Sequence, residues 1–118
     1  MNNIEVGHWS NGNLRYLKIY HDIGVPHNTE GPATQLWYKN GQEARRAFYI
    51  NGRLYNTEGP AVIEWDESGE EVYRRYLIND VEYTEEEFYE YKNTVEVSVE
   101  GGKTVRISRQ SAESLNLI

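Results

Sequence analysis

Cysteine is absent from this chain of 118 residues, and apolar residues never form a long run. Without thiols there is no disulfide, no thiolate metal site and no cysteine nucleophile. A membrane-spanning helix needs about 20 consecutive apolar residues, and no segment provides them. The first ten residues also lack the basic start and the apolar stretch of a signal peptide, so we expect a cytoplasmic protein with no membrane partner.

Aliphatic side chains are scarce as well, because Leu, Ile, Val and Phe together number only 26. A share of about 20% in a strongly charged chain is typical of disordered proteins. Ten tyrosines and three tryptophans shift that balance, since each aromatic ring buries about 150–250 Å² on folding. We therefore expect a folded protein with an aromatic core.

Positive charge is in short supply, with 12 basic against 19 acidic residues and a formal net charge of -7. Direct binding of nucleic acid is not expected, because phosphate affinity comes from clustered Lys and Arg. The acidity is uneven: residues 58–100 contain 14 acidic and 3 basic residues. This segment is where a partner with a basic surface would dock.

An internal repeat is the strongest signal in the sequence. Trp9, Trp37 and Trp65 follow one another at one constant interval. The hexapeptide Asn28–Ala33 returns unchanged at the same interval, as Asn56–Ala61. Self-similarity at a fixed period of this length is typical of repeat architectures, so we expect about three 28-residue units.

Turn chemistry predicts that each unit is an antiparallel hairpin. Asn40-Gly41 and Ser68-Gly69 follow the second and third tryptophans, and a two-residue loop with positive φ favours such pairs. One face of each hairpin is then mainly apolar and the other polar, as in a half-solvated antiparallel sheet. The facing pairs are Trp37 with Ala44, Gln35 with Arg46, Leu36 with Arg45, Tyr38 with Glu43, Trp65 with Val72, Ile63 with Arg74, Glu64 with Tyr73, and Asp66 with Glu71.

Between hairpins, Gly31 and Gly59 can take a positive φ, and Pro32 and Pro60 suit the first residue of the next strands. After Tyr83 the pattern changes.

Thr84 followed by Glu87 forms a capping box that opens a helix to about Lys92. Alternating valines around Gly101-Gly102 then predict a hairpin, and residues 110–117 a weak helix. The expected fold is mainly β: an antiparallel meander of about three 28-residue repeats, a short helical cap, a C-terminal hairpin and a weak terminal helix. Residues 1–83 form the tandem β-repeat region and residues 84–118 the cap with its hairpin, in one compact domain.

The units resemble the MORN-like variant β-repeats found in bacterial and phage open reading frames. The residues that carry the resemblance are Asn51–Tyr55, the two Gly-Pro-Ala steps, Trp37 and Trp65 with their turns, and Ile78–Phe88. The resemblance covers residues 9–92, although the period is longer than that of true MORN repeats. It implies a non-catalytic interaction module, a phage-type origin and a location in the host cytoplasm, and it identifies no site.

The acidic segment supplies the first group of candidate residues. Three roles stay open for these carboxylates: a solvated tip that discourages aggregation, a surface that binds a basic partner, and a Ca²⁺ or Mg²⁺ site without an EF-hand pattern. The candidates for partner binding are Asp66, Glu67, Glu70, Glu71, Glu85 and Glu86.

An aromatic and arginine face supplies the second group, with Arg46 and Arg74 beside Trp37 and Trp65. Cation–π stacking explains this pattern, and the alternative is an open groove for a ligand or peptide. The three histidines show no metal-binding spacing, so they are interpreted as surface or turn residues. No nucleophile motif or phosphate-binding loop occurs, so we expect no enzyme, no metal and no cofactor.

Three functions follow, and the leading one is a protein-interaction module, a phage accessory protein that modulates a host protein. The alternative is an acidic mimic of nucleic acid that inhibits a host defence nuclease through residues 58–100. A third is a metal-dependent or sugar-binding module with Trp and Tyr platforms. The open edge near Ile4–Trp9 also predicts a homodimer through the N-terminal hairpin.

Overall fold

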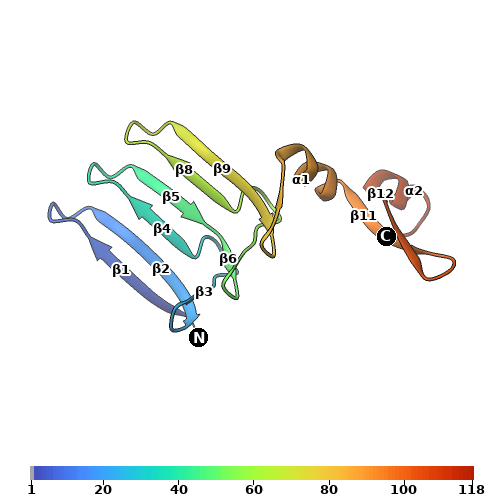
Figure 1. Cartoon of the computed structure of the whole chain (residues 1–118), viewed down its shortest axis with the longest axis horizontal. Coiled ribbons are helices and arrows are strands. Elements are labelled where there is room, and N and C mark those ends of the chain that lie inside the picture. Colours follow the sequence, from blue (N-terminus) through green and yellow to red (C-terminus); the bar gives the residue numbers. More distant parts are fainter. Residues whose placement is uncertain (1) are drawn as a thin grey trace. The chain divides into compact units, whose positions relative to one another are not determined.

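Residues 2–118 are described by a computed structural model of the chain (Figure 1). Strands make up 49% of the chain and helices 12%, which confirms the predicted mainly β class. The largest sheet is antiparallel, and its strands follow one another in chain order, as in a meander. In the part of the chain that the structure describes, no helix is long and apolar enough to cross a membrane.

Contacts divide the chain into two compact units, residues 1–83 and 84–118. Three tall hairpins lie side by side in the first unit, and short hairpins lie at the end opposite their tips (Figure 1). The tall hairpins are β1 (Asn3–His8) with β2 (Leu14–Asp22), β4 (Thr34–Trp37) with β5 (Glu43–Ala47), and β8 (Val62–Trp65) with β9 (Glu71–Ile78). The shorter strands are β3 (Val25–Pro26), β6 (Tyr49–Ile50), β7 (Arg53–Leu54) and β10 (Val81–Tyr83).

The predicted register holds in the body of the second and third hairpins. The confirmed pairs are Gln35 with Arg46, Leu36 with Arg45, Ile63 with Arg74 and Glu64 with Tyr73. Successive residues of a strand point to opposite faces, so this register fixes which side chains share a face.

The hairpin tips differ from the prediction. Gly41 N–H donates to the carbonyl of Tyr38, and Tyr38 N–H donates to the carbonyl of Gln42, which closes a three-residue loop. Gly41 has a φ of 90°, while Asn40 is not among the residues of positive φ. The loop is therefore the three-residue type that places glycine in the left-handed region, and Asn-Gly serves it as well as the two-residue type. The same bonds recur at Asp66, Gly69 and Glu70.

A β-bulge follows each of these tips, so Trp37 faces Glu43 and Trp65 faces Glu71. Between each tip and Leu36 or Glu64, the extra loop residue shifts the strand pairing by one position relative to the predicted register. The prediction was therefore wrong for the pairs nearest the tips: Trp37 with Ala44, Tyr38 with Glu43, Trp65 with Val72, and Asp66 with Glu71.

The first hairpin is offset from the other two. Trp9 N–H donates to the carbonyl of Asn13 and the Trp9 carbonyl accepts from Gly12, so Trp9 takes the loop-closing place of Tyr38 and Asp66. His8, opposite Leu14, stands where the other hairpins have tryptophan. The step from the first tip to the second is thus one residue longer than the step from the second to the third. The irregularity between Tyr20 and Asp22 absorbs the extra residue.

The links between hairpins are held by asparagine side chains. Asn28 Oδ1 accepts from Glu30 N–H and its Nδ2 donates to the carbonyl of Pro32, and Asn56 makes the equivalent bonds. Because the side chain closes this turn, no left-handed residue is needed, and neither Gly31 nor Gly59 has a positive φ. The next strands begin at Thr34 and Val62 rather than at the prolines.

The core is smaller and more aliphatic than predicted. Its central cluster contains Ala47, Ala61, Val62 and Leu77, with Tyr49 and Leu54 packed against it. All three tryptophans are only half-buried. They lie beside the hairpin tips and do not supply the core, whereas Tyr76 and Phe88 are aromatic residues that are buried, so the predicted aromatic core is confirmed only in part.

The second unit contains α1 (Glu85–Lys92), β11 (Thr94–Val99), β12 (Lys103–Ser108) and α2 (Arg109–Ser114). Thr84 and Glu87 form the predicted capping box, and Phe88 is buried. Gly101 and Gly102 both take a positive φ in the turn between β11 and β12. Arg106 stacks on the Tyr91 ring at 4.2 Å and donates to the Tyr91 carbonyl, which ties the end of α1 to β12.

Candidate binding face of the sheet

One face of the first unit carries a row of side chains that crosses the three hairpins. Cross-strand pairing brings Leu17, Gln35, Arg46, Ile63 and Arg74 into this row. Trp37 and Trp65 lie two residues along their strands from Gln35 and Ile63, so they point to the same side. We call this side the arginine face, and it unites the predicted group Trp37, Arg46, Trp65 and Arg74.

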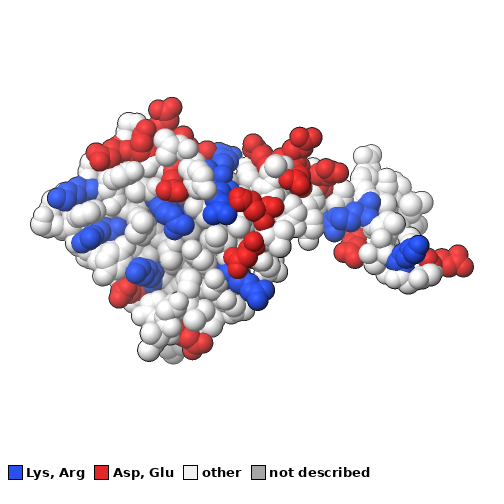
Figure 2. All heavy atoms as spheres, in the orientation of Figure 1, with Lys and Arg blue, Asp and Glu red and all other residues white. Residues whose placement is uncertain are grey.

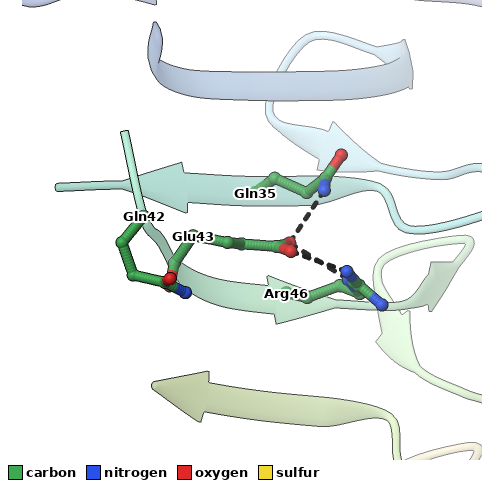
Figure 3. A network of polar contacts seen from close by, with 4 residues as sticks. All are labelled: Gln35, Gln42, Glu43 and Arg46. Carbon is green, nitrogen blue, oxygen red and sulfur yellow. Dashed lines mark hydrogen bonds and ion pairs between the residues drawn. The ribbon is translucent and has the colours of Figure 1, made fainter. Parts of the chain in front are cut away.

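The bulges add a carboxylate to this face. In a regular strand, residues three apart point to opposite sides, so Glu43 and Arg46 would be separated by the sheet. The bulge at Glu43 reverses its direction, and Arg46 donates to Glu43 Oε1 at 2.6 Å and to Oε2 at 3.0 Å. Gln35 Nε2 adds a third bond to Oε2 at 2.8 Å, and Gln42 Nε2 donates to the Glu43 carbonyl (Figure 3).

Glu43 and Arg46 form a strong ion pair, because the two bonds are short and parallel. Burial alone would raise the pKa of Glu43, but the hydrogen bonds from Arg46 and Gln35 outweigh it and hold the pKa below 4.5. The bonds to Glu43 in turn raise the pKa of Arg46. The charge of this arginine is therefore largely compensated from within the same strand.

Arg46 also joins two hairpins, since its guanidinium lies 5.2 Å from the centre of the Trp65 ring. The predicted cation–π contact thus exists, but it reaches the next hairpin and not Trp37 of its own. Trp37 is linked to the first hairpin instead, because its carbonyl accepts a bond from Trp9 Nε1 at 3.0 Å.

The third hairpin repeats the ion pair. Arg74 donates two bonds of 2.7 Å to Glu71 and one of 3.1 Å to the hydroxyl of buried Tyr76. The bonds from Arg74 lower the pKa of Glu71. Neither Glu43 nor Gln35 was among the candidate residues, although the sequence signal was present: Glu43 and Arg46 recur one repeat later as Glu71 and Arg74.

A groove of about 470 Å³ lies on the arginine face, between the two asparagine links. We call it the link groove, and its volume is within the range of about 300–1,000 Å³ found for ligand sites. The links contribute the same polar groups from both sides, since each carries Thr and Glu after its asparagine. The groove is lined by residues 28–31 and 56–60 and, between them, by Arg46, Phe48, Ile50, Tyr55 and Ile63.

Two carboxylates at the β8–β9 tip have hydrogen-bonding partners. Asp66 accepts bonds from Ser68 N–H, the Ser68 hydroxyl and Glu70 N–H, which lowers its pKa, the hydroxyl contributing most. Glu67, Glu70 and Glu71 are all exposed to solvent, and Glu71 is ion-paired with Arg74.

Acidic side chains gather both at the β8–β9 tip and on α1 (Figure 2). Glu85 and Glu86 are exposed in the first turn of α1, in the second compact unit.

The histidines His21 and His27 meet near the turn of β6 and β7, with ring centres 4.6 Å apart. His27 Nδ1 accepts from Asn51 N–H at 2.9 Å, and His21 Nε2 lies 2.8 Å from Asn51 Oδ1. They brace a turn, in agreement with their interpretation as turn residues. Within residues 2–118, no three acidic or histidine side chains are grouped to hold a metal ion.

Comparison with protein-family models, curated proteins and solved structures finds no match to this chain.

Proposed function

We propose that the protein is a non-catalytic interaction module that binds a basic segment of a protein partner in the link groove. One observation carries the proposal: two identical links flank a groove whose lining combines apolar side chains with the exposed Glu30 and Glu58. Arg46, the basic residue of the lining, is compensated by Glu43 at 2.6 Å. A lysine or arginine next to an apolar residue complements this arrangement.

The resemblance to MORN-like repeats and the phage-type origin stay predictions, as does action in the host cytoplasm. They agree with an interaction module, but the groove supports the function independently of them.

The test is an NMR titration with a short peptide of alternating lysine and leucine. We expect the backbone signals of Thr29, Glu30, Thr57 and Glu58 to shift, and the affinity to fall as salt rises. The double variant Glu30→Gln/Glu58→Gln removes both carboxylate charges and should weaken binding by about tenfold or more. Glu100→Gln/Glu113→Gln removes the same charge from the second unit and should leave the affinity unchanged.

The same titration addresses the nucleic-acid mimic. The acidic segment 58–100 would act through its exposed carboxylates, but Glu71 and Glu82 are ion-paired with arginines. If the peptide shifted the protein's backbone signals at the β8–β9 tip and in α1, and left those of the link groove unchanged, the result would favour the mimic and contradict binding in the link groove.

A further inference from the structure

The second strand of each tall hairpin pairs in a regular way along the edge that faces away from its own first strand. β2 pairs with β4 at residues 16–18 and with β3 near Tyr20 and Asp22. β5 pairs with β8 at residues 45–47, and β6 continues this edge by pairing with β7. Each of these edges therefore receives two partners: a short strand near its end and the next tall hairpin near its middle.

Within residues 2–118, β9 has the short strand as a partner but not a following tall hairpin. β10 pairs with residues 76–78 of β9, in the same way that β3 pairs with β2 and β7 with β6. Residues 73–75 correspond to 16–18 of β2 and 45–47 of β5. Within residues 2–118, no further tall hairpin follows to cover that part of the edge.

The opposite end of the sheet offers a matching strand. Among the described residues, β1 pairs only with β2, whereas its counterparts β4 and β8 are paired on both edges. It contains no lysine or proline, the residues that commonly protect an edge strand. Its side chains Ile4 and Val6 are 65% and 44% exposed.

We propose that β1 of one copy pairs with residues 73–75 of a second copy, so that the sheet continues from molecule to molecule. Repeating the register of β4 on β2 places Glu5 opposite Arg75, Val6 opposite Arg74 and Gly7 opposite Tyr73. Arg74 and Arg75 already form ion pairs with Glu71 and Glu82 of their own molecule, so the backbone hydrogen bonds between the two edges hold the contact together, rather than charge. Glu5 opposite Arg75 adds a second carboxylate to the existing Arg75–Glu82 pair.

Such a contact is head-to-tail, because the two surfaces that meet are different. It builds open chains of molecules whose length grows with concentration. A symmetric dimer through two β1 strands is the competing arrangement, and it leaves the β9 edge uncovered.

Disulfide trapping distinguishes these arrangements, because the natural chain has no cysteine. In one molecule, Glu5 and Arg75 are separated by five strand spacings, about 24 Å, which is too far for a disulfide. Under mild oxidation, the double variant Glu5→Cys/Arg75→Cys should give a ladder of multimers on a non-reducing gel, which collapses on reduction. The control Asp22→Cys/Arg75→Cys, with one cysteine moved off the β1 edge, should give no ladder.

Two results would overturn the proposal. A disulfide dimer of Val6→Cys without the 5–75 ladder would establish the symmetric contact. A wild-type protein that sediments as a monomer at every concentration up to the millimolar range would exclude both contacts. Sedimentation also provides a check without cysteines: Val6→Lys faces Arg74 and should weaken association by about tenfold or more, whereas Ile23→Lys, at a fully exposed turn, should not.

Discussion

At the scale of single residues, Ala44 and Val72 have an effect out of proportion to their size. Each is the additional residue of a bulge, and each reverses the direction of the glutamate before it. Without that reversal, Glu43 and Glu71 would lie on the face opposite their arginines. The ion pairs of the arginine face therefore depend on backbone geometry at residues that form no ion pair themselves.

The Glu43–Arg46 pair predicts a specific dependence on pH. The pKa of Glu43 is lower in the folded protein than its ordinary 4.5, so the unfolded chain binds more protons as the pH falls through this range. The stabilisation is therefore complete above the ordinary pKa and is lost as the pH falls towards and below the folded value. Glu43→Gln should be less stable than wild type near pH 6, and the difference should shrink steadily as the pH falls below 4.5. Urea unfolding at several pH values measures it, and a difference that stays constant would contradict the pair.

Trp65 predicts a moderate loss of stability. Because it is half-buried, Trp65→Ala should cost about 2–3 kcal/mol, less than the 3–5 kcal/mol typical of a buried tryptophan. Part of this cost is the contact with Arg46. A double-mutant cycle with Arg46→Met should give a coupling of about 0.5–1 kcal/mol, and a coupling near zero would show that the stacking contributes nothing.

At the scale of elements, hairpins could be predicted but their tips could not. The period and the turn residues located the strands, and the register was right at Gln35–Arg46 and Ile63–Arg74. Asn-Gly suits both two-residue and three-residue loops, so the sequence could not distinguish them. The choice between the loops determines where the bulge lies, and so the place of Glu43.

Trp9 shows a second limit of the sequence pattern. Its distance of one full period from Trp37 suggested that the two residues are equivalent. The backbone hydrogen bonds show instead that Trp9 is equivalent to Tyr38. An extra residue near His21, where β2 and β3 change register, restores the phase of the later turns. Such a compensated shift leaves the spacing of conspicuous residues intact and is invisible until backbone bonds are known.

Helix α1 was predictable to its first residue, because the capping box is a local signal. Thr84 stands one period after Asn56, and both side chains accept a backbone N–H at the start of their segment. Thr84→Ala should destabilise the second unit by about 1 kcal/mol, within the range of 0.5–2 kcal/mol for lost N-caps. Thr84→Ser keeps the hydroxyl oxygen and should restore most of the stability. Equal losses in the two variants, measured by thermal unfolding, would contradict a capping role.

At the scale of the whole molecule, the same backbone hydrogen bonds recur in the first unit, with both partners advanced by one sequence period. Asn28 N–H donates to the carbonyl of Tyr49, and Asn56 N–H to that of Leu77. Gly52 N–H donates to the carbonyl of Pro26, and Asp80 N–H to that of Leu54, again with both partners advanced by one period. In repeat proteins each repeat mainly contacts its neighbours, so removing an internal repeat lets the two repeats on either side of it meet.

Deletion of residues 29–56 tests this construction, since the identical hexapeptides leave an unchanged sequence across the junction. The shortened protein should fold, with Lys18 opposite Val62 and Leu17 opposite Ile63, as they are now opposite Thr34 and Gln35. Its urea transition should stay cooperative with a lower midpoint and a slope smaller by roughly a quarter, because less surface is exposed on unfolding. Deletion of residues 29–55 is the control: it leaves one extra residue at the link, beyond the one that the Tyr20–Asp22 irregularity already absorbs, so it should distort the link or shift the register and lower the midpoint further. If both deletions behaved alike, the 28-residue step would not be the unit from which the sheet is built.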